Sequence, residues 1–226
     1  MLIPGLLASA RMYAAQVPQS WRAGPVMIAD HTRDDSMSGI ARRILSAAPA
    51  RFALAGLSMG GYIAFEVLRQ APQRIAKVAL LDTSARADAP EQSAMRRAQM
   101  TLASQGRLAE VVEQQFPRLV QRARRADVEL RQLFDLMAQE VGAAGFIRQQ
   151  TAILGRADSR ATLGSIRCPT LVLVGEGDEL TPPELAAEIA AGIPGARLTT
   201  VPQCGHMSTL EQPDEVTRAL LEWLEA

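Results

Sequence analysis

One stretch of sequence decides how this chain folds: residues 54–62, LAGLSMGGY. Apolar residues 52–55 predict a buried strand and residues 62–70 a helix, which leaves a tight turn around Ser58. Such a turn has no room for side chains on either side of the serine, and Gly56 and Gly60 stand there. At a helix N-terminus, unpaired amides would stabilise negative charge on Ser58. The pattern indicates a nucleophile, although ordinary turns match it by chance.

Composition bounds the class of protein. The chain has 226 residues, 48% of them hydrophobic, which is enough for one α/β domain with an insertion. Basic and acidic residues balance at 24 each, which argues against a nucleic-acid-binding protein. No run of about 18 apolar residues occurs, so we expect no transmembrane helix and no membrane partner.

The N-terminus and the cysteines favour a cytoplasmic protein. Residues 1–10 lack the basic start of a secretion signal, and Pro4-Gly5 interrupts their apolar run. Cys168 and Cys204 have neither metal-ligand spacing nor a disulfide framework, so we interpret them as free thiols in a reducing compartment.

Strand and helix signals alternate along most of the chain, which predicts a mostly parallel sheet with flanking helices. The alternation stops between about residues 85 and 163, where we expect four helices and no strand. Asp127 would cap the third of these helices, and residues 146–154 would form the fourth. This block reads as a helical lid, 85–163, inserted into a core made of residues 1–84 and 164–226. The expected strands are residues 1–3, 26–29, 52–55, 75–81, 170–174 and 197–201, and a helix is expected over residues 8–16.

Two further residues complete a catalytic pattern with Ser58. Asp178 and His206 each follow a predicted strand, as Ser58 does. The carboxyl ends of parallel strands meet at one edge of a sheet, which is where such folds bind ligands. A serine nucleophile needs a base and an orienting acid, and the order serine, acid, histidine is that of the α/β-hydrolases.

On these motifs the chain resembles the α/β-hydrolase superfamily, in particular its lid-bearing serine esterases. Residues 56–60 are similar to the nucleophile elbow, 175–178 to the acid turn and 205–206 to the base loop. Pro4-Gly5-Leu6 resembles the oxyanion loop, where many members have His-Gly. Family members usually begin with two more strands, which are absent here. We therefore expect either that the natural chain starts upstream or that its sheet is reduced.

The resemblance implies a role for each matching residue and no cofactor or metal. Ser58 would attack a carbonyl and become acylated, and His206 would take its proton. Asp178 would orient the imidazole, and the amides of Leu6 and Met59 would bind the oxyanion.

Three other residues are of types that could take part in catalysis. Asp82 also ends a strand and is an alternative acid, but we interpret it as a cap of the turn at Thr83-Ser84. His31 reads as a loop residue bonded to backbone rather than as a catalytic group, and Cys204 as a packing residue.

The sequence thus predicts a serine hydrolase that acts on carboxylic esters or thioesters, with Phe134 and Met137 of the lid contacting substrate. The same triad could instead serve C–C bond hydrolysis, enol-lactone hydrolysis or perhydrolysis. A non-catalytic ligand-binding protein is a further alternative, although an intact triad argues against it. Six lid arginines would be solvated, dock an acidic carrier protein or bind an anionic substrate. They are Arg96, Arg97, Arg118, Arg122, Arg124 and Arg125.

Overall fold

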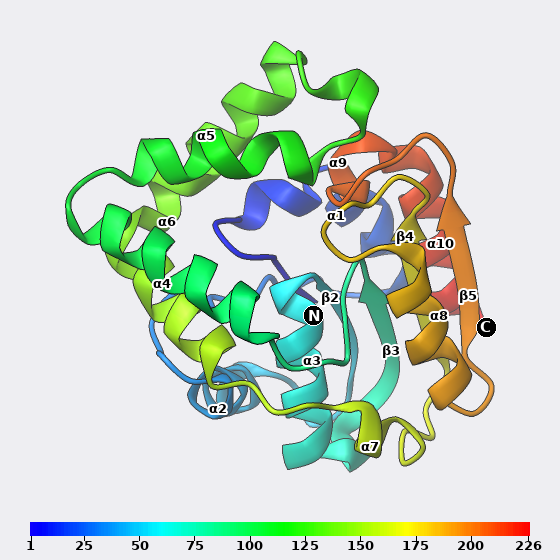
Figure 1. Cartoon of the computed structure of the whole chain (residues 1–226). Coiled ribbons are helices and arrows are strands. Elements are labelled where there is room, and N and C mark those ends of the chain that lie inside the picture. The colour runs from blue at the N-terminus through cyan, green and yellow to red at the C-terminus, as the bar shows by residue number, and fades with distance from the viewer.

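The computed structural model describes all 226 residues, Met1–Ala226. Five parallel strands form one sheet in the order β1-β2-β3-β4-β5, so the predicted parallel α/β fold is confirmed (Figure 1). The strands are β1 Leu2–Ile3, β2 Phe52–Leu57, β3 Ile75–Leu81, β4 Thr170–Gly175 and β5 Arg197–Val201.

One expected strand is wrong. Residues 26–29 form only an isolated bridge, in which Ile28 pairs with Leu2. The Leu2 amide donates to the Met27 carbonyl at 2.8 Å, and the Ala29 amide donates to the Leu2 carbonyl at 2.9 Å. Since β1 has two residues, it offers too short an edge for a regular ladder to form.

The central strands β2, β3 and β4 are largely buried on both faces, as strands of parallel sheets usually are, whereas the edge strand β5 is mostly exposed. Alternate residues of β3 enter different hydrophobic clusters: Val78 and Leu80 belong to one, and Ala79 and Leu81 to the other. This follows from the two-residue side-chain period of a strand. It explains why β2, β3 and β4 have mostly continuous apolar runs in the sequence instead of alternating apolar and polar residues.

Helices supply the other half of each cluster. On one face, α2 (Met37–Ala47), α3 (Met59–Gln70) and α8 (Pro183–Gly192) contribute buried isoleucines. On the other face, α10 (Pro213–Glu225) contributes Val216, Leu220 and Trp223 and packs against α1 (Gln16–Ser20). The shorter elements are the 3₁₀ helices Ala10–Tyr13, Trp21–Ala23 and Pro72–Arg74 and the helix α9, Ser208–Glu211.

The chain near the N-terminus differs from the single helix expected over residues 8–16. A 3₁₀ helix, Ala10–Tyr13, is followed by α1, Gln16–Ser20. Pro18 has no amide hydrogen to bond back to residue 14, so α-helical bonding cannot run through both segments.

Between β3 and β4 the chain is entirely helical or irregular, as predicted. It contains α4 (Pro90–Ser104), α5 (Leu108–Leu119), a 3₁₀ turn (Arg122–Arg124), α6 (Val128–Leu154) and α7 (Arg160–Leu163). In Figure 1, α4, α5 and α6 form one group of helices beside the sheet, and both α4 and α5 pack on α6. We define the lid as residues 85–163.

The third and fourth expected lid helices are one element. Asp127 caps α6, since its Oδ1 accepts the Leu130 amide at 3.0 Å. Gly142 interrupts the helix with φ 68° and ψ 169°, a conformation that glycine adopts without a steric cost. None of the helices combines the length and apolarity needed to cross a membrane.

Candidate active site

Ser58 sits on the turn from β2 to α3 in a strained conformation, with φ 56° and ψ −114°. A Cβ atom on Gly56 would lie 2.2 Å from the Gly60 carbonyl oxygen, and one on Gly60 would lie 2.2 Å from the Ile3 carbonyl oxygen. Any side chain at either position would therefore collide with backbone. The two motif glycines are required for the close packing that holds Ser58 at the end of the sheet, as predicted.

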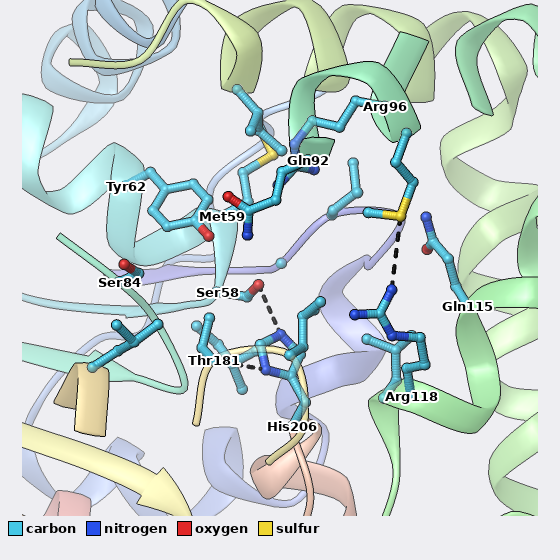
Figure 2. Close-up of a pocket in the computed structure, with 18 of the residues that line it drawn as sticks. Ser58, Met59, Tyr62, Ser84, Gln92, Arg96, Gln115, Arg118, Thr181 and His206 are labelled. Carbon is cyan, nitrogen blue, oxygen red and sulfur yellow. Dashed lines mark hydrogen bonds between the residues drawn. The ribbon is translucent and has the colours of Figure 1, made fainter. Parts of the chain in front are cut away.

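The structure brings Ser58, His206 and Asp178 together from the ends of three strands. Nε2 of His206 lies 2.8 Å from Oγ of Ser58, and Nδ1 lies 2.8 Å from Oδ2 of Asp178. Figure 2 shows Ser58 directed at the His206 ring. A carboxylate only accepts hydrogen bonds, so Nδ1 carries the proton and Nε2 is free to accept the serine hydrogen. All three side chains are buried.

Asp178 is held in place by its own turn. Its Oδ1 accepts the amides of Leu180 and Thr181 at 2.8 and 2.9 Å, and its Oδ2 accepts the Thr181 hydroxyl at 2.7 Å. The Thr181 oxygen also lies 3.1 Å from Nδ1 of His206. Burial alone would raise the pKa of Asp178, but the charge of His206 and these hydrogen bonds outweigh it and lower that pKa. The carboxylate therefore stays ionised.

Thr181 was missed by the sequence reasoning. A short polar residue three positions after an aspartate at a turn is the signal that could have identified it, because such residues bond back to the turn.

The pKa of His206 reflects two opposing effects. Burial lowers it, because a charged ring is poorly solvated there, while the adjacent negative charge of Asp178 raises it. The net pKa lies above the ordinary 6.5. The ring is consequently a stronger base than a free histidine, which suits it to remove a proton from Ser58.

The side chain of Asp82 makes different contacts from those expected. Its side chain is fully buried; Oδ1 accepts the Gly175 amide at 2.9 Å, and Oδ2 accepts the Ser208 hydroxyl. It does not cap the turn at Thr83-Ser84, so that interpretation is wrong, and it makes no hydrogen bond to His206. Burial and then the charge of Asp178 raise the pKa of Asp82 well above 3.8. Asp82 links β3 to β4 and to the loop that carries His206.

The predicted oxyanion donors are both free. The amides of Leu6 and Met59 donate to no acceptor within the protein, and both residues line the cavity beside Ser58. The loop is fixed on each side of Leu6, because Gly5 donates to the Met12 sulfur at 3.4 Å and Leu7 donates to Oε1 of Gln149 at 3.2 Å. Fixed, unpaired donors are what stabilisation of an oxyanion requires.

His31 lies behind this loop. Its Nε2 is 2.9 Å from the Gly5 carbonyl oxygen and 3.0 Å from Nε2 of Gln149. Burial lowers the pKa of His31, so the ring is neutral. It does not line the cavity and makes no hydrogen bond to the triad, which agrees with the prediction of a backbone-bonded residue.

A cavity of about 520 Å³ opens over Ser58 between the sheet and the lid. Phe134 lines it, as expected, but Met137 does not. Met137 has no exposed surface and packs into the hydrophobic cluster beneath α6, so its prediction as a substrate contact is wrong. Residues three apart lie on the same helix face, but part of that face borders the cavity and part packs into the core. The sequence does not show which residue lies in which part.

The lid arginines are mostly paired with carboxylates. Arg96 contacts Asp88 at 2.7 Å, Arg124 contacts Asp127 at 2.6 Å, and Arg122 and Arg125 both contact Glu179 at 2.8 Å. Arg97 and Arg118 have no carboxylate partner. The lid is accordingly less basic than its arginine count suggests.

The two cysteines are free, as expected. Cys204 is fully buried in the hydrophobic cluster, and burial raises the pKa of its thiol. It is a packing residue and not a second nucleophile.

Residues 2–219 match the model of the alpha/beta hydrolase family. The chain belongs to this family. Among curated relatives, a "Putative non-heme bromoperoxidase BpoC" of Mycobacterium tuberculosis is 27% identical over 79% of this chain and 69% of its own length. A "Pimeloyl-[acyl-carrier protein] methyl ester esterase" of Chromobacterium violaceum is 30% identical over 75% of this chain and 68% of its own length.

Solved structures of hydrolases have the same fold. A thermophilic esterase from Thermogutta terrifontis superposes with a TM-score of 0.89 at 29% identity, over 99% of this chain and 88% of that one. An enol-lactonase from Burkholderia xenovorans superposes with a TM-score of 0.88 at 22% identity, over 100% of this chain and 91% of that one, and shows the fold alone. This chain is accordingly a hydrolase of the alpha/beta hydrolase family whose relatives include esterases.

Proposed function

We propose that this protein is a serine hydrolase that cleaves carboxylic esters or thioesters through an acyl-enzyme on Ser58. One observation carries the proposal: Ser58, His206 and Asp178 form a continuous hydrogen-bonded chain with both links at 2.8 Å. This chain lies at a cavity that also presents the free amides of Leu6 and Met59.

The mechanism follows from these positions. Ser58 Oγ attacks the substrate carbonyl carbon while its proton passes to Nε2 of His206, and Asp178 stabilises the resulting imidazolium. The carbonyl oxygen becomes an oxyanion bound by the amides of Leu6 and Met59. Losing one such donor typically costs about 3–4 kcal/mol of transition-state stabilisation.

Collapse of this intermediate breaks the ester or thioester bond. His206 gives its proton to the leaving alcohol or thiol, and the acyl group remains on Ser58. Water then attacks the acyl carbonyl as His206 takes the water's proton. A second collapse returns that proton to Ser58 and releases the carboxylic acid.

Other reactions could use the same triad. C–C bond hydrolysis, enol-lactone hydrolysis and perhydrolysis remain alternatives. Their support is that the similar proteins include one named as an enol-lactonase and one named as a bromoperoxidase. Ester or thioester cleavage is preferred because relatives named as esterases recur among the curated sequences and the structures. A ligand-binding protein without activity would have no need for the strained backbone of Ser58, nor for a histidine of raised pKa beside its hydroxyl.

An acidic carrier protein is a further proposed partner at the lid. Its support is that several relatives are named as pimeloyl-[acyl-carrier protein] methyl ester esterases. Of the six lid arginines named above, four are already paired with carboxylates, and Arg97 and Arg118 remain available to such a partner.

The proposal is tested with a fluorophosphonate probe and p-nitrophenyl esters. Wild-type protein should be labelled, and Ser58→Ala should lose both labelling and hydrolysis, with a drop on the order of 10⁶ in kcat. Ser84→Ala, which removes another serine hydroxyl of the cavity wall, should still be labelled. Undiminished turnover by folded Ser58→Ala would overturn the assignment of the nucleophile.

A further inference from the structure

The cavity over Ser58 carries an excess of positive charge. Four arginines line it, and no aspartate or glutamate does. Arg96 and Arg156 share Asp88, at 2.7 and 2.6 Å, and Arg86 contacts Glu188 at 2.9 Å. The fourth arginine, Arg118, has no carboxylate partner. Four cations are thus opposed by two carboxylates, both of which lie outside the cavity wall.

Arg96 and Arg156 have little capacity for a ligand. Arg96 uses its remaining Nη1 on Oε1 of Gln150 at 2.8 Å. Arg156 donates from Nε to the Arg86 carbonyl at 3.1 Å and stacks over the Tyr62 ring at 4.3 Å. These two side chains are also more than four-fifths buried, with 14% and 6% exposed. They shape the wall and fix α4 to the end of α6.

Arg118 is different. Its polar contact within the protein is a weak one, from Nη1 to the Met95 sulfur at 3.7 Å. Figure 2 shows this side chain extending from α5 into the cavity, on the opposite side of Ser58 from Tyr62 and next to Gln115. A guanidinium has five N–H donors, and a thioether is a poor acceptor. Arg118 therefore presents nearly its full set of donors to whatever fills the cavity.

We propose that Arg118 binds a carboxylate at the far end of the acyl group, so that the preferred substrates are half-esters or half-thioesters of dicarboxylic acids. This inference rests on the proposed function and names its substrate class. The planar guanidinium matches a carboxylate in a two-point contact, which neither water nor Met95 reproduces. The wall of the same cavity also includes Leu119, Phe134 and Met207, which suit an apolar linker.

The expected preference is moderate. Arg118 is exposed to solvent, so water and salt screen its attraction for the ligand. A charged hydrogen-bonded contact of this kind corresponds to about a tenfold effect or somewhat more. The preference should shrink as ionic strength rises.

The test compares two series of substrates of graded chain length. One consists of mono-p-nitrophenyl esters of dicarboxylic acids, and the other of p-nitrophenyl esters of monocarboxylic acids with the same number of carbons. The ratio of kcat/KM between matched esters should fall about tenfold in Arg118→Ala and remain partly preserved in Arg118→Lys. Arg42→Ala serves as the control, because Arg42 is exposed on α2, outside the cavity, and has no carboxylate partner.

Two kinetic results would overturn the proposal. One is a wild-type preference for the neutral ester at every chain length. The other is an equal change of the ratio in Arg118→Ala and Arg42→Ala, since that would show a general charge effect and not a binding site.

Calorimetry separates this inference from the proposed function. Folded Ser58→Ala should bind adipate more tightly than hexanoate, and the added Arg118→Ala change should remove the difference. If wild-type protein cleaves no ester, the proposed function fails, and the titration still decides whether the carboxylate site exists. Equal binding of adipate and hexanoate, or binding of inorganic phosphate as tight as that of adipate, would contradict a carboxylate site.

Discussion

Nδ1 of His206 lies 2.8 Å from a carboxylate oxygen of Asp178, and this contact selects one acid from two buried candidates. The charge of Asp82 contributes to the raised pKa of His206, but the Asp82 oxygens accept hydrogen bonds from Gly175 and Ser208. The orienting role therefore belongs to Asp178 in our proposal, and the two aspartates should respond very differently to the same substitution.

The first prediction contrasts Asp178→Asn with Asp82→Asn. An amide at position 178 favours the wrong tautomer of His206, and the equivalent change in a serine protease lowers kcat about 10⁴-fold. Asp178→Asn should therefore lose several orders of magnitude in kcat, while Asp82→Asn should lose little. Both variants are assayed at one pH, with circular dichroism to confirm folding. The reverse pattern would move the acid to Asp82.

The second prediction concerns pH. His206 accepts a proton only when neutral, so activity must rise as pH rises through its pKa. Because Asp178 raises that pKa above 6.5, the midpoint of the acidic limb of kcat/KM should also lie above 6.5. His31 is the other histidine in the chain, and burial lowers its pKa below 6.5. A midpoint below 6.5 would thus implicate His31 or an unpaired His206.

The third prediction assigns chain-length preference to the lid. Phe134 lines the cavity from α6, whereas the triad residues lie outside the lid. Phe134→Ala should change the relative kcat/KM values among p-nitrophenyl esters of different length, because it enlarges the acyl site without moving the reacting atoms. Leu136→Ala is the matched control, since Leu136 is 45% exposed on the same helix.

Truncating a buried phenylalanine also costs about 3–5 kcal/mol of stability. Thermal unfolding must therefore accompany the kinetics. A uniform loss for every ester, proportional to the unfolded fraction, would show that Phe134 supports the lid and does not select the substrate.

The sequence by itself determined the features that depend on local backbone geometry. The glycines around Ser58 are required by a turn that excludes a Cβ, and the structure shows the collisions that either substitution would cause. Continuous apolar runs marked four of the five strands well, and the ends of parallel strands necessarily meet at one edge. Those two rules were enough to predict that Ser58, Asp178 and His206 lie close together, as they do in the structure.

The tertiary structure decided what depends on contacts between distant parts of the chain. Helix periodicity placed Phe134 and Met137 on one face, and both are buried in the same hydrophobic cluster, but only packing determined that Phe134 also lines the cavity and Met137 does not. Six arginines predicted a basic lid, whereas in the structure four of them contact Asp88, Asp127 or Glu179. Only the structure shows that Arg118 has no carboxylate partner. Whether a charged side chain is paired depends on which side chains surround it in space, and the local sequence does not determine those neighbours.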